Sequence, residues 1–342
     1  MKEWPKEWDI PLVSVRCTAY NQEQYITNTL DGFLMQNTDF PFEVVVHDDA
    51  STDRTADIIR EYETKYPRII KAIYEKENLY SKKDGSLSRA ILPYLRGKYV
   101  AFCEGDDYWC SPDKLAKQVC ALEKHPNCSI CTHYVQPIYE NGSIKQGCLL
   151  PEKKFNSGVV TQEEYAYWLL LKGQCTFQLS SYLFLTEYLF EIEKNKPCYF
   201  KFAHVGDEKY QRYCLNKGKL FFIPEIMSRY RLQSKNSWTL REFSSIANKK
   251  KHCEEMIKLD EAFDVFSNHK FSSYIEAGKK ERFFSFLVQT QQYRELFREE
   301  NIEKLPVLNF SLRIRFKLYS ILPFLQKCAI FVHKIKLFFR FR

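Results

Sequence analysis

The last 32 residues of this 342-residue chain contain no aspartate or glutamate, although they hold eight lysines and arginines. The first 310 residues carry 43 basic and 43 acidic side chains, so the whole net charge of +8 comes from the C-terminal segment. The body therefore lacks the basic surface that nucleic-acid binding requires, and we predict no nucleic-acid partner. In the alternative, the basic tail alone would bind DNA or RNA in a salt-sensitive way.

Long apolar runs are also missing. The N-terminal MKEWPKEWDI is charged and does not fit a secretory signal. In residues 311–342 the longest uncharged run is nine residues, which is too short to span a bilayer. Basic residues alternate there with Phe, Leu and Ile, as in segments that lie at an anionic membrane surface. We predict a cytoplasmic protein, peripheral at the inner face of the cell membrane through residues 311–342; the alternative is a helix packed on the body.

The 12 cysteines show no disulfide-framework spacing, which favours a reduced, cytosolic protein. Cys128 and Cys131 form a C-x-x-C pair, but no second pair completes a zinc site. A hydrophobic content of 45% is sufficient for a substantial core and argues against global disorder.

Strand-like and helix-like segments alternate through the first 135 residues. Such alternation, with short connections, predicts an α/β fold with a mostly parallel sheet and helices on both faces. The predicted strands are 11–18, 42–47, 69–74, 98–103 and 128–135, and the predicted helices are 23–36, 53–66, a segment ending near 95, and 112–124.

The pattern after residue 135 is less regular. Thr161 begins a capping box that predicts a helix to about residue 172, and residues 174–186 are compatible with a strand. A further helix is expected to end near Gly218, followed by two strand-like runs on either side of Pro224. We divide the chain into an α/β domain (1–240), a helical extension (241–310) and a basic amphipathic tail (311–342).

The stretch GKYVAFCEGDDYWCSPDK, residues 97–114, combines the strongest signals. A short apolar strand ends in Glu104, Asp106 and Asp107, and Ser111 is the predicted N-cap of the next helix. In open α/β sheets, ligands bind beyond the carboxyl ends of the strands. Clustered carboxylates repel one another unless a cation neutralises them. Oxygen ligands favour a hard divalent ion, so we predict Mn²⁺ or Mg²⁺ at this turn.

Polar segments follow two further strands, at Thr18-Ala19-Tyr20-Asn21 and at Asp48-Asp49. Five pieces occur in order over roughly residues 10–240: VSVRCTAYNQEQYI, FEVVVHDDASTDRT, GKYVAFCEGDDYW, HVGDE and IPEIMSRYR. Together they resemble an inverting family 2 glycosyltransferase of the GT-A fold, an enzyme class that uses nucleotide-sugar donors. Residues 241–342 are outside the resemblance.

The resemblance implies a donor site. Thr18 and Tyr20 would line the nucleoside pocket. Asp49 would accept a hydrogen bond from a ring N–H of the base, which favours a uridine donor, while Asp48 would brace its turn or touch the ligand. The metal would be held by Asp107, Asp106 and Glu104 and would bridge the diphosphate. Glu104 stands where family members often have aspartate.

The resemblance also implies the general base, Asp207 of HVGDE, which would deprotonate the acceptor hydroxyl. A helix N-cap is the alternative role for Asp207, and Glu208 is the second candidate for the base. Arg231 matches a late arginine that would reach the diphosphate. Gln233 replaces a histidine that many relatives carry, and glutamine is neither a strong metal ligand nor a proton donor.

These observations predict a hexosyltransferase-type enzyme, metal-dependent, that moves a sugar from a nucleotide-sugar to a hydroxyl of a glycan or lipid-linked acceptor. Bacterial surface polysaccharide synthesis is the setting that the family and the tail suggest. The alternative is a non-catalytic relative that binds a nucleotide-sugar or serves as a membrane scaffold.

Overall fold

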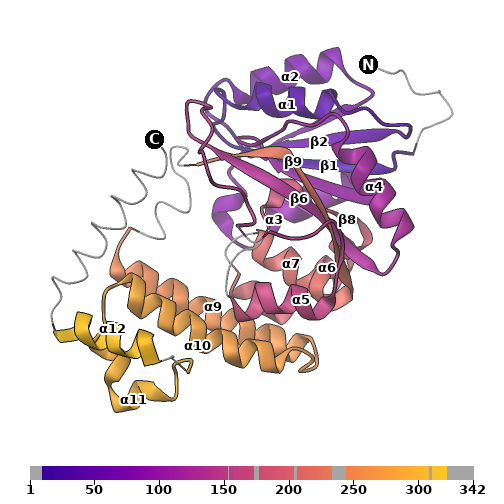
Figure 1. Ribbon diagram of the computed structural model, residues 1–342. Helices are drawn as coiled ribbons and strands as arrows, with labels where there is room; N and C mark the ends of the chain where they lie inside the picture. Colours follow the sequence, from indigo (N-terminus) through magenta and orange to yellow (C-terminus); the bar gives the residue numbers. More distant parts are fainter. Residues whose placement is uncertain are drawn as a thin grey trace. The chain divides into compact units, whose positions relative to one another are not determined.

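The computed structural model of the chain describes residues 10–152, 154–172, 177–203, 206–232, 244–307 and 310–321. Gln233 and residues 322–342 lie outside these ranges. The chain forms two compact units, drawn in Figure 1: Met1–Leu169 with Gln174–Leu240, and Leu170–Gly173 with Arg241–Arg342.

The first unit is built on one mixed sheet with the strand order β3-β2-β1-β4-β8-β6-β9-β5, and β7 pairs with β9. The strands are β1 (Val13–Ala19), β2 (Phe42–Asp48), β3 (Ile70–Tyr74), β4 (Tyr99–Glu104), β5 (Tyr108–Trp109), β6 (Cys128–Ile138), β7 (Gly158–Val160), β8 (Leu183–Leu185) and β9 (Lys219–Arg231). The predicted α/β fold is confirmed. Strands β1 to β4 are parallel, whereas β8 runs antiparallel to both β4 and β6.

Helices cover this sheet: α1 (Ile26–Leu34), α2 (Thr55–Lys65), α3 (Ser86–Ile91), α4 (Lys114–Lys124), α5 (Gln162–Ala166), α6 (Glu187–Asn195) and α7 (Gly206–Lys217). Helix α1 buries Ile26, Leu30 and Phe33, at the spacing expected for one helix face. The Thr161 cap is confirmed, since its Oγ1 accepts from the Glu164 amide at 3.2 Å. The Ser111 cap is wrong, because α4 begins only at Lys114 and has Asp113 at the N-cap position.

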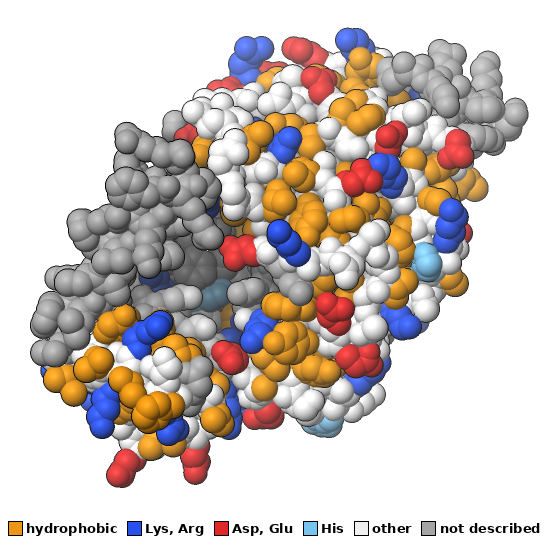
Figure 2. Space-filling model, viewed as in Figure 1, with side chains coloured by type: hydrophobic (Ala, Val, Ile, Leu, Met, Phe, Trp, Pro, Cys, Tyr) orange, Lys and Arg blue, Asp and Glu red, His pale blue; other side chains and the backbone are white. Residues whose placement is uncertain are grey.

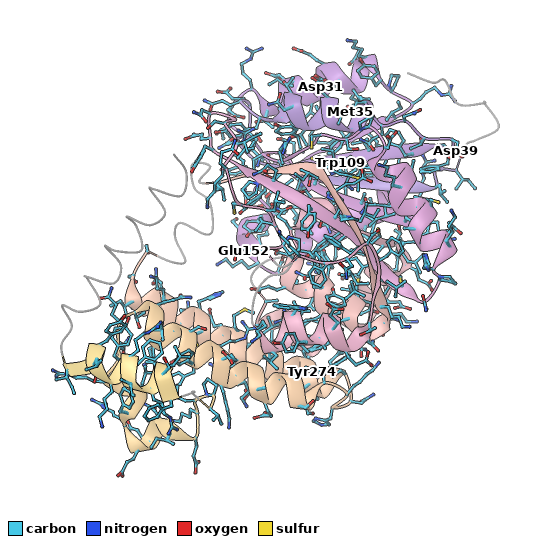
Figure 3. The ribbon with its side chains drawn as sticks, viewed as in Figure 1. Asp31, Met35, Asp39, Trp109, Glu152 and Tyr274 are labelled. Atoms are coloured by element: carbon cyan, nitrogen blue, oxygen red, sulfur yellow. The ribbon has the colours of Figure 1, made fainter. Side chains whose placement is uncertain are left out.

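The core of the first unit lies between the parallel strands and helices α1 and α4. Trp109, labelled in Figure 3, is 1% exposed and meets the Phe33 ring edge-on at a centroid distance of 4.8 Å. Lys114 Nζ lies 4.0 Å from the Trp109 ring centroid and donates to Gln118 Oε1 at 2.7 Å. Complete burial lowers the pKa of Lys114 to about 7. The acidic turn is therefore followed directly by two buried, closely packed side chains, Trp109 and Lys114.

The two strand-like runs around Pro224 form a single strand, β9. The register between β6 and β9 shifts there: His133 pairs with Ile223, and the next residue, Tyr134, pairs with Ile226. Proline has no N–H to donate to a ladder, so a bulge at this point keeps the strand continuous. As a result, β9 extends far enough to bring Arg231 to the acidic turn.

The second unit is helical, with α9 (Ile246–Phe266), α10 (Ser272–Gln289), α11 (Glu299–Ile302) and α12 (Phe310–Ile321). Asp260 and Arg282 form a buried ion pair that joins α9 to α10 at 3.0 Å. A small apolar core unites the later helices: Phe286, Leu287, Tyr293, Leu296, Leu305 and Phe316. Among the described residues, no helix has the length and apolar character needed to cross a bilayer.

Candidate active site

Three strand ends meet at one edge of the sheet. In the parallel register, Thr18 of β1 lies opposite Glu104 of β4, and Ala19 lies opposite Asp48 of β2. Because parallel strands place their carboxyl ends together, the segments that follow them share this edge. Tyr20, just beyond β1, is 46% exposed. The structure thus gathers the residues expected to form the donor site.

The segments after β1 and β2 are bonded to each other. Asn21 Oδ1 accepts from the Thr52 amide at 2.7 Å, and the Asn21 amide donates to Ser51 Oγ at 3.0 Å. Asn21 and Ala50 have φ values of 52° and 61°, in the left-handed region that asparagine tolerates better than alanine. These bonds fix the loop after β1 against the loop after β2, beside the expected donor site.

Asp48 and Asp49 differ in their surroundings, although both are buried. The Asp49 carboxylate accepts from the amides of Leu79 and Tyr80, at 2.6 and 3.0 Å. Asp48 Oδ2 accepts from the Ser51 amide at 3.2 Å, while its Oδ1 has no hydrogen-bond partner in the described part of the chain. Asp49 therefore anchors the segment after β3, and Asp48 retains an unused acceptor.

Asp107 is held on both sides. Its Oδ1 accepts from the Arg231 amide at 2.9 Å, its Oδ2 accepts from Gln178 Nε2 at 3.0 Å, and the residue is 1% exposed. The fully buried Thr29 hydroxyl lies 2.6 Å from the carbonyl oxygen of Asp107 and 2.9 Å from that of Gly105. Both carboxylate oxygens of Asp107 thus accept hydrogen bonds inside the protein, and its role as a metal ligand stays a prediction.

Gly105, between the acidic residues, packs against the end of β1. A Cβ added there would contact Gln22 Oε1 and lie 3.1 Å from both Ala19 Cβ and Ile26 Cδ1. The backbone approach is thus too close for a side chain. This contact leaves Glu104 exposed and Asp106 partly exposed on either side of the glycine.

Arg231 is 4% exposed and braces the same turn. Its Nε donates to the Asp106 carbonyl at 3.1 Å, and Nη1 donates to the Glu140 carbonyl at 2.8 Å. Its guanidinium carbon lies 4.3 Å from the centroid of the Tyr25 ring. The structure therefore places Arg231 against backbone carbonyls, and a role at the diphosphate stays a prediction.

Asp207 is electrostatically coupled to the acidic turn. Desolvation by the surrounding protein, then the charges of Asp106 and Asp207, raise the pKa of Glu104 to about 8, while Arg16 opposes the shift. Burial, followed by the charge of Asp106, raises the pKa of Asp107 well above its usual range. Asp207 lies within the first turn of α7 and is partly exposed, so it is inside the helix rather than its N-cap.

Arg16 is a site neighbour that the sequence analysis did not single out. It lies on β1 and is 7% exposed. Its Nη1 donates to the Tyr210 hydroxyl at 2.9 Å and its Nη2 to Ser88 Oγ at 3.2 Å. Tyr210 is one turn beyond Asp207 on α7, so Arg16 ties the central strand to the helix that carries Asp207. The charge of Arg16, the single one in the strand VSVRCTA, was the available signal.

We expect the Arg16–Tyr210 bond to stabilise the position of α7. A double-mutant cycle of Arg16→Met and Tyr210→Phe should give a coupling of about 1 kcal/mol in urea unfolding, since the bond is buried and charge-assisted. Arg60→Met is the matched control, because Arg60 pairs with Asp57 at the surface, and it should cost less than about 0.5 kcal/mol. Strictly additive effects of the two buried substitutions would argue against the link.

The residues present fit a divalent cation. Glu104 and Asp106 offer hard oxygen ligands at the surface. Desolvation is the main cause of the raised pKa of Glu104, and the charges of Asp106 and Asp207 add a repulsion that a cation would relieve. The described residues contain no group of three or more His, Cys, Asp or Glu side chains arranged to hold a metal. This is compatible with Mg²⁺ or Mn²⁺, which often take one or two carboxylates and complete their shell with phosphate and water.

The raised pKa of Glu104 predicts a pH-dependent stability. An unfolded glutamate is ionised above its ordinary pKa of 4.5, whereas folded Glu104 stays protonated up to about pH 8. The folded state thus binds more protons in this range, and stability falls as pH rises. Lys114, whose pKa is lowered to about 7, binds fewer protons in the folded than in the unfolded state above that pH and contributes the opposite slope. We therefore expect the melting temperature in EDTA to fall between about pH 7 and 8.5 relative to that of Glu104→Gln, which retains Lys114. Mg²⁺ should reduce this difference.

The buried histidines titrate below this pH range. Burial lowers the pKa values of His47 and His133, so their contribution to stability increases with pH, with the opposite sign, and is complete near pH 7. Melting temperatures of wild type and Glu104→Gln that change in parallel from about pH 7 to 8.5 would show that Glu104 has an ordinary pKa.

Curated relatives match part of the chain. An uncharacterised Mycobacterium tuberculosis protein is 46% identical over 131 residues, which are 38% of this chain and 37% of that protein. The Escherichia coli protein WfaP, named UDP-Glc:alpha-D-GlcNAc-diphosphoundecaprenol beta-1,3-glucosyltransferase, is 36% identical over 112 residues, 33% of this chain and 41% of WfaP. The chain thus spans less than half the length of these relatives.

Solved structures share the fold over most of the chain. S. aureus TarS 1–349 in complex with UDP-GlcNAc superposes with a TM-score of 0.59 at 19% identity, covering 85% of this chain and 78% of TarS. The mannosyltransferase PcManGT of Pyrobaculum calidifontis, in complex with GDP-Man and Mn²⁺, gives a TM-score of 0.51 at 15% identity, covering 94% and 84%.

The mixed sheet is that of the GT-A fold, shared with TarS. Residues 14–173 match the family model described as Glycosyl transferase family 2, and the chain carries a domain of that family. The matched range includes the acidic turn but ends before Asp207 and Arg231.

Proposed function

We propose that this chain is an inverting glycosyltransferase that moves a sugar from a UDP-sugar to a hydroxyl group. The observation that carries the proposal is the meeting of the ends of β1, β2 and β4 at one sheet edge, with Asp207 coupled to the same acidic turn. The donors named for TarS and WfaP, UDP-GlcNAc and UDP-Glc, support a uridine nucleotide.

In this proposal the donor lies along the sheet edge. Thr18 and the exposed Tyr20 line the nucleoside pocket. The base is bound by Asp49 and its neighbour Asp48, whose Oδ1 is an unused hydrogen-bond acceptor. Asp106 and Glu104 hold Mn²⁺ or Mg²⁺, which when bound neutralises the diphosphate that leaves. The Mn²⁺ complex of PcManGT supports this cation. Asp107 and Arg231 keep the turn in shape from inside, and Arg231 is the residue proposed to approach the diphosphate.

Asp207 is proposed as the general base. It takes the proton of the acceptor hydroxyl as that oxygen bonds to the anomeric carbon, while the bond from that carbon to the diphosphate oxygen breaks. The nucleotide leaves with the electron pair, and the configuration inverts because attack is in line. Arg16 acts through Tyr210 to keep α7, and with it Asp207, in position.

The acceptor is proposed to be a glycan or a lipid-linked sugar of a bacterial surface polysaccharide. WfaP, whose name includes a diphosphoundecaprenol acceptor, supports a lipid-linked substrate. An acceptor of this kind lies at the membrane, and the eight basic residues and dense apolar residues of 311–342 support peripheral association with the anionic inner face.

Titration calorimetry with UDP, first with Mn²⁺ and then with EDTA, tests the donor site. We expect binding that depends on the metal, and turnover of one member of a panel of UDP-sugars. GDP and dTDP are the controls for the base. Binding of GDP in preference to UDP would contradict the uridine assignment, and binding without turnover on any acceptor would favour the non-catalytic alternative.

A further inference from the structure

Helix α12 carries an apolar stripe on the side that faces solvent. Phe310, Ile314, Leu318 and Ile321 are 79%, 45%, 44% and 62% exposed. At about 100° per residue, these four side chains lie within an arc of about 80°. The opposite face holds Phe316, which is 8% exposed and packed in the core of the second unit. The stripe is therefore additional to the face that folding already uses.

Unpaired cations flank the stripe. Arg313 and Lys317 lie along one side of it and Arg315 along the other, and all three are exposed. Arg294 lies beside the end of α12, since its Nε reaches the Ser320 carbonyl at 3.4 Å. Across the described residues, none of these four has an acidic partner, whereas nearby Arg298 pairs with Glu295 at 3.1 Å. Figure 2 shows hydrophobic and basic side chains interleaved over the part of the second unit where Figure 1 draws α12.

An open hollow joins the stripe to two of these cations. It has a volume of about 400 Å³ and is lined by Arg294, Phe297, Lys317, Ser320 and Ile321. Phe297 and Ile321 are themselves 38% and 62% exposed. One small hollow thus offers two cationic donors and a hydroxyl beside two apolar side chains, a combination suited to an amphiphile with an anionic head.

We propose that the second unit docks on an anionic phospholipid bilayer through α12. The stripe enters the acyl region, and the hollow receives a lipid phosphate between Arg294 and Lys317. This deepens the proposed membrane association of residues 311–342, on which it rests, by assigning the contact to folded residues. The charge argument selects a membrane over a second copy of the chain, because a copy would present the same unpaired cations to them.

Hydrogen–deuterium exchange of the full chain tests the assignment, with vesicles of phosphatidylglycerol, vesicles of phosphatidylcholine, or inorganic phosphate. We expect phosphatidylglycerol vesicles alone to protect Arg294–Phe297 and Phe310–Ile321. Protection confined to 322–342 would overturn the inference while leaving the proposed membrane association in place. Equal protection by inorganic phosphate, or protection that increases with protein concentration without lipid, would also overturn it.

Vesicle binding by substituted proteins provides a second test of the docking surface on α12. Ile314→Ser with Leu318→Ser should weaken binding to phosphatidylglycerol vesicles by about tenfold or more. Arg294→Gln with Lys317→Gln should weaken it by roughly 30-fold at low salt, and less at high salt. Val265→Ser is the matched control, because Val265 is a 61% exposed residue on α9 of the same unit. Both double variants should bind UDP like the wild type, and vesicle binding equal to that of the control would overturn the inference.

Discussion

Replacing Asp207 with asparagine should reduce sugar transfer by about 10²- to 10⁴-fold, because asparagine cannot accept the acceptor proton. The substitution keeps the shape of the side chain in the first turn of α7. UDP binding depends on the sheet edge. It should stay within about twofold of wild type by calorimetry, since Asp207 is not proposed to contact the nucleotide. The transfer rate with saturating donor is the measurement that decides.

Glu208→Gln is the control for Asp207→Asn. Glu208 follows Asp207 on α7 but is only 8% exposed, so it is less accessible to an acceptor. We expect Glu208→Gln to retain most of the transfer rate. Loss of transfer in Glu208→Gln with retention in Asp207→Asn would exchange the two roles and identify Glu208 as the base.

Although the two residues are adjacent, Asp106→Asn should mainly weaken metal-dependent UDP binding, whereas Asp107→Asn should mainly lower the free energy of unfolding. Asp106 is partly exposed and is proposed to hold the cation, so its replacement should weaken metal-dependent UDP binding. The loss should exceed the roughly 10- to 100-fold effect of removing an outer-shell partner. The melting temperature should change little or increase, because one charge leaves a repelling cluster.

Asp107→Asn places an amide donor against the donors of Gln178 or Arg231 inside the protein. Leaving a buried donor unsatisfied costs about 1–3 kcal/mol, so the free energy of unfolding should fall by that amount. Once folded, the variant should still respond to Mn²⁺ when it binds UDP. A stable Asp107→Asn protein that has lost the metal response would identify Asp107 as a direct ligand.

The strands were predictable because each is a short apolar run that ends in polar residues. Val13–Ala19 and Tyr99–Glu104 differ from the expected strands by only one or two residues at each end. Local rules failed where distant pairing decides the structure. The expected strand 174–186 is described from residue 177 onward, and this described part contains one short strand, β8 (Leu183–Leu185). The preceding Leu179–Ser181 forms a 3₁₀ turn, and the Ser180 carbonyl accepts a hydrogen bond from Trp109.

The acidic turn was identifiable from its residues, but the division of labour within it was not. Asp106 and Asp107 look equivalent in sequence, and it is the long-range bonds from Gln178 and Arg231 that hold the Asp107 carboxylate inside the protein. The Thr29 hydroxyl donates to two carbonyl oxygens of the turn. The sequence around Thr29 predicts no more than a buried threonine in a helix. Partners so far away in the chain leave no pattern in a single sequence.

The bond from Arg231 to Asp107 also bears on how the protein is made. It joins residues separated by 124 positions, and the β6–β9 pairing that delivers Arg231 is complete only when β9 has formed. Because long-range closures form late, the parallel strands β1 to β4 are expected to assemble on the ribosome while the acidic turn is still unbraced. Nascent chains arrested before Arg231 emerges should therefore contain a partly ordered sheet that cannot retain nucleotide, and donor binding should begin only after β9 is released.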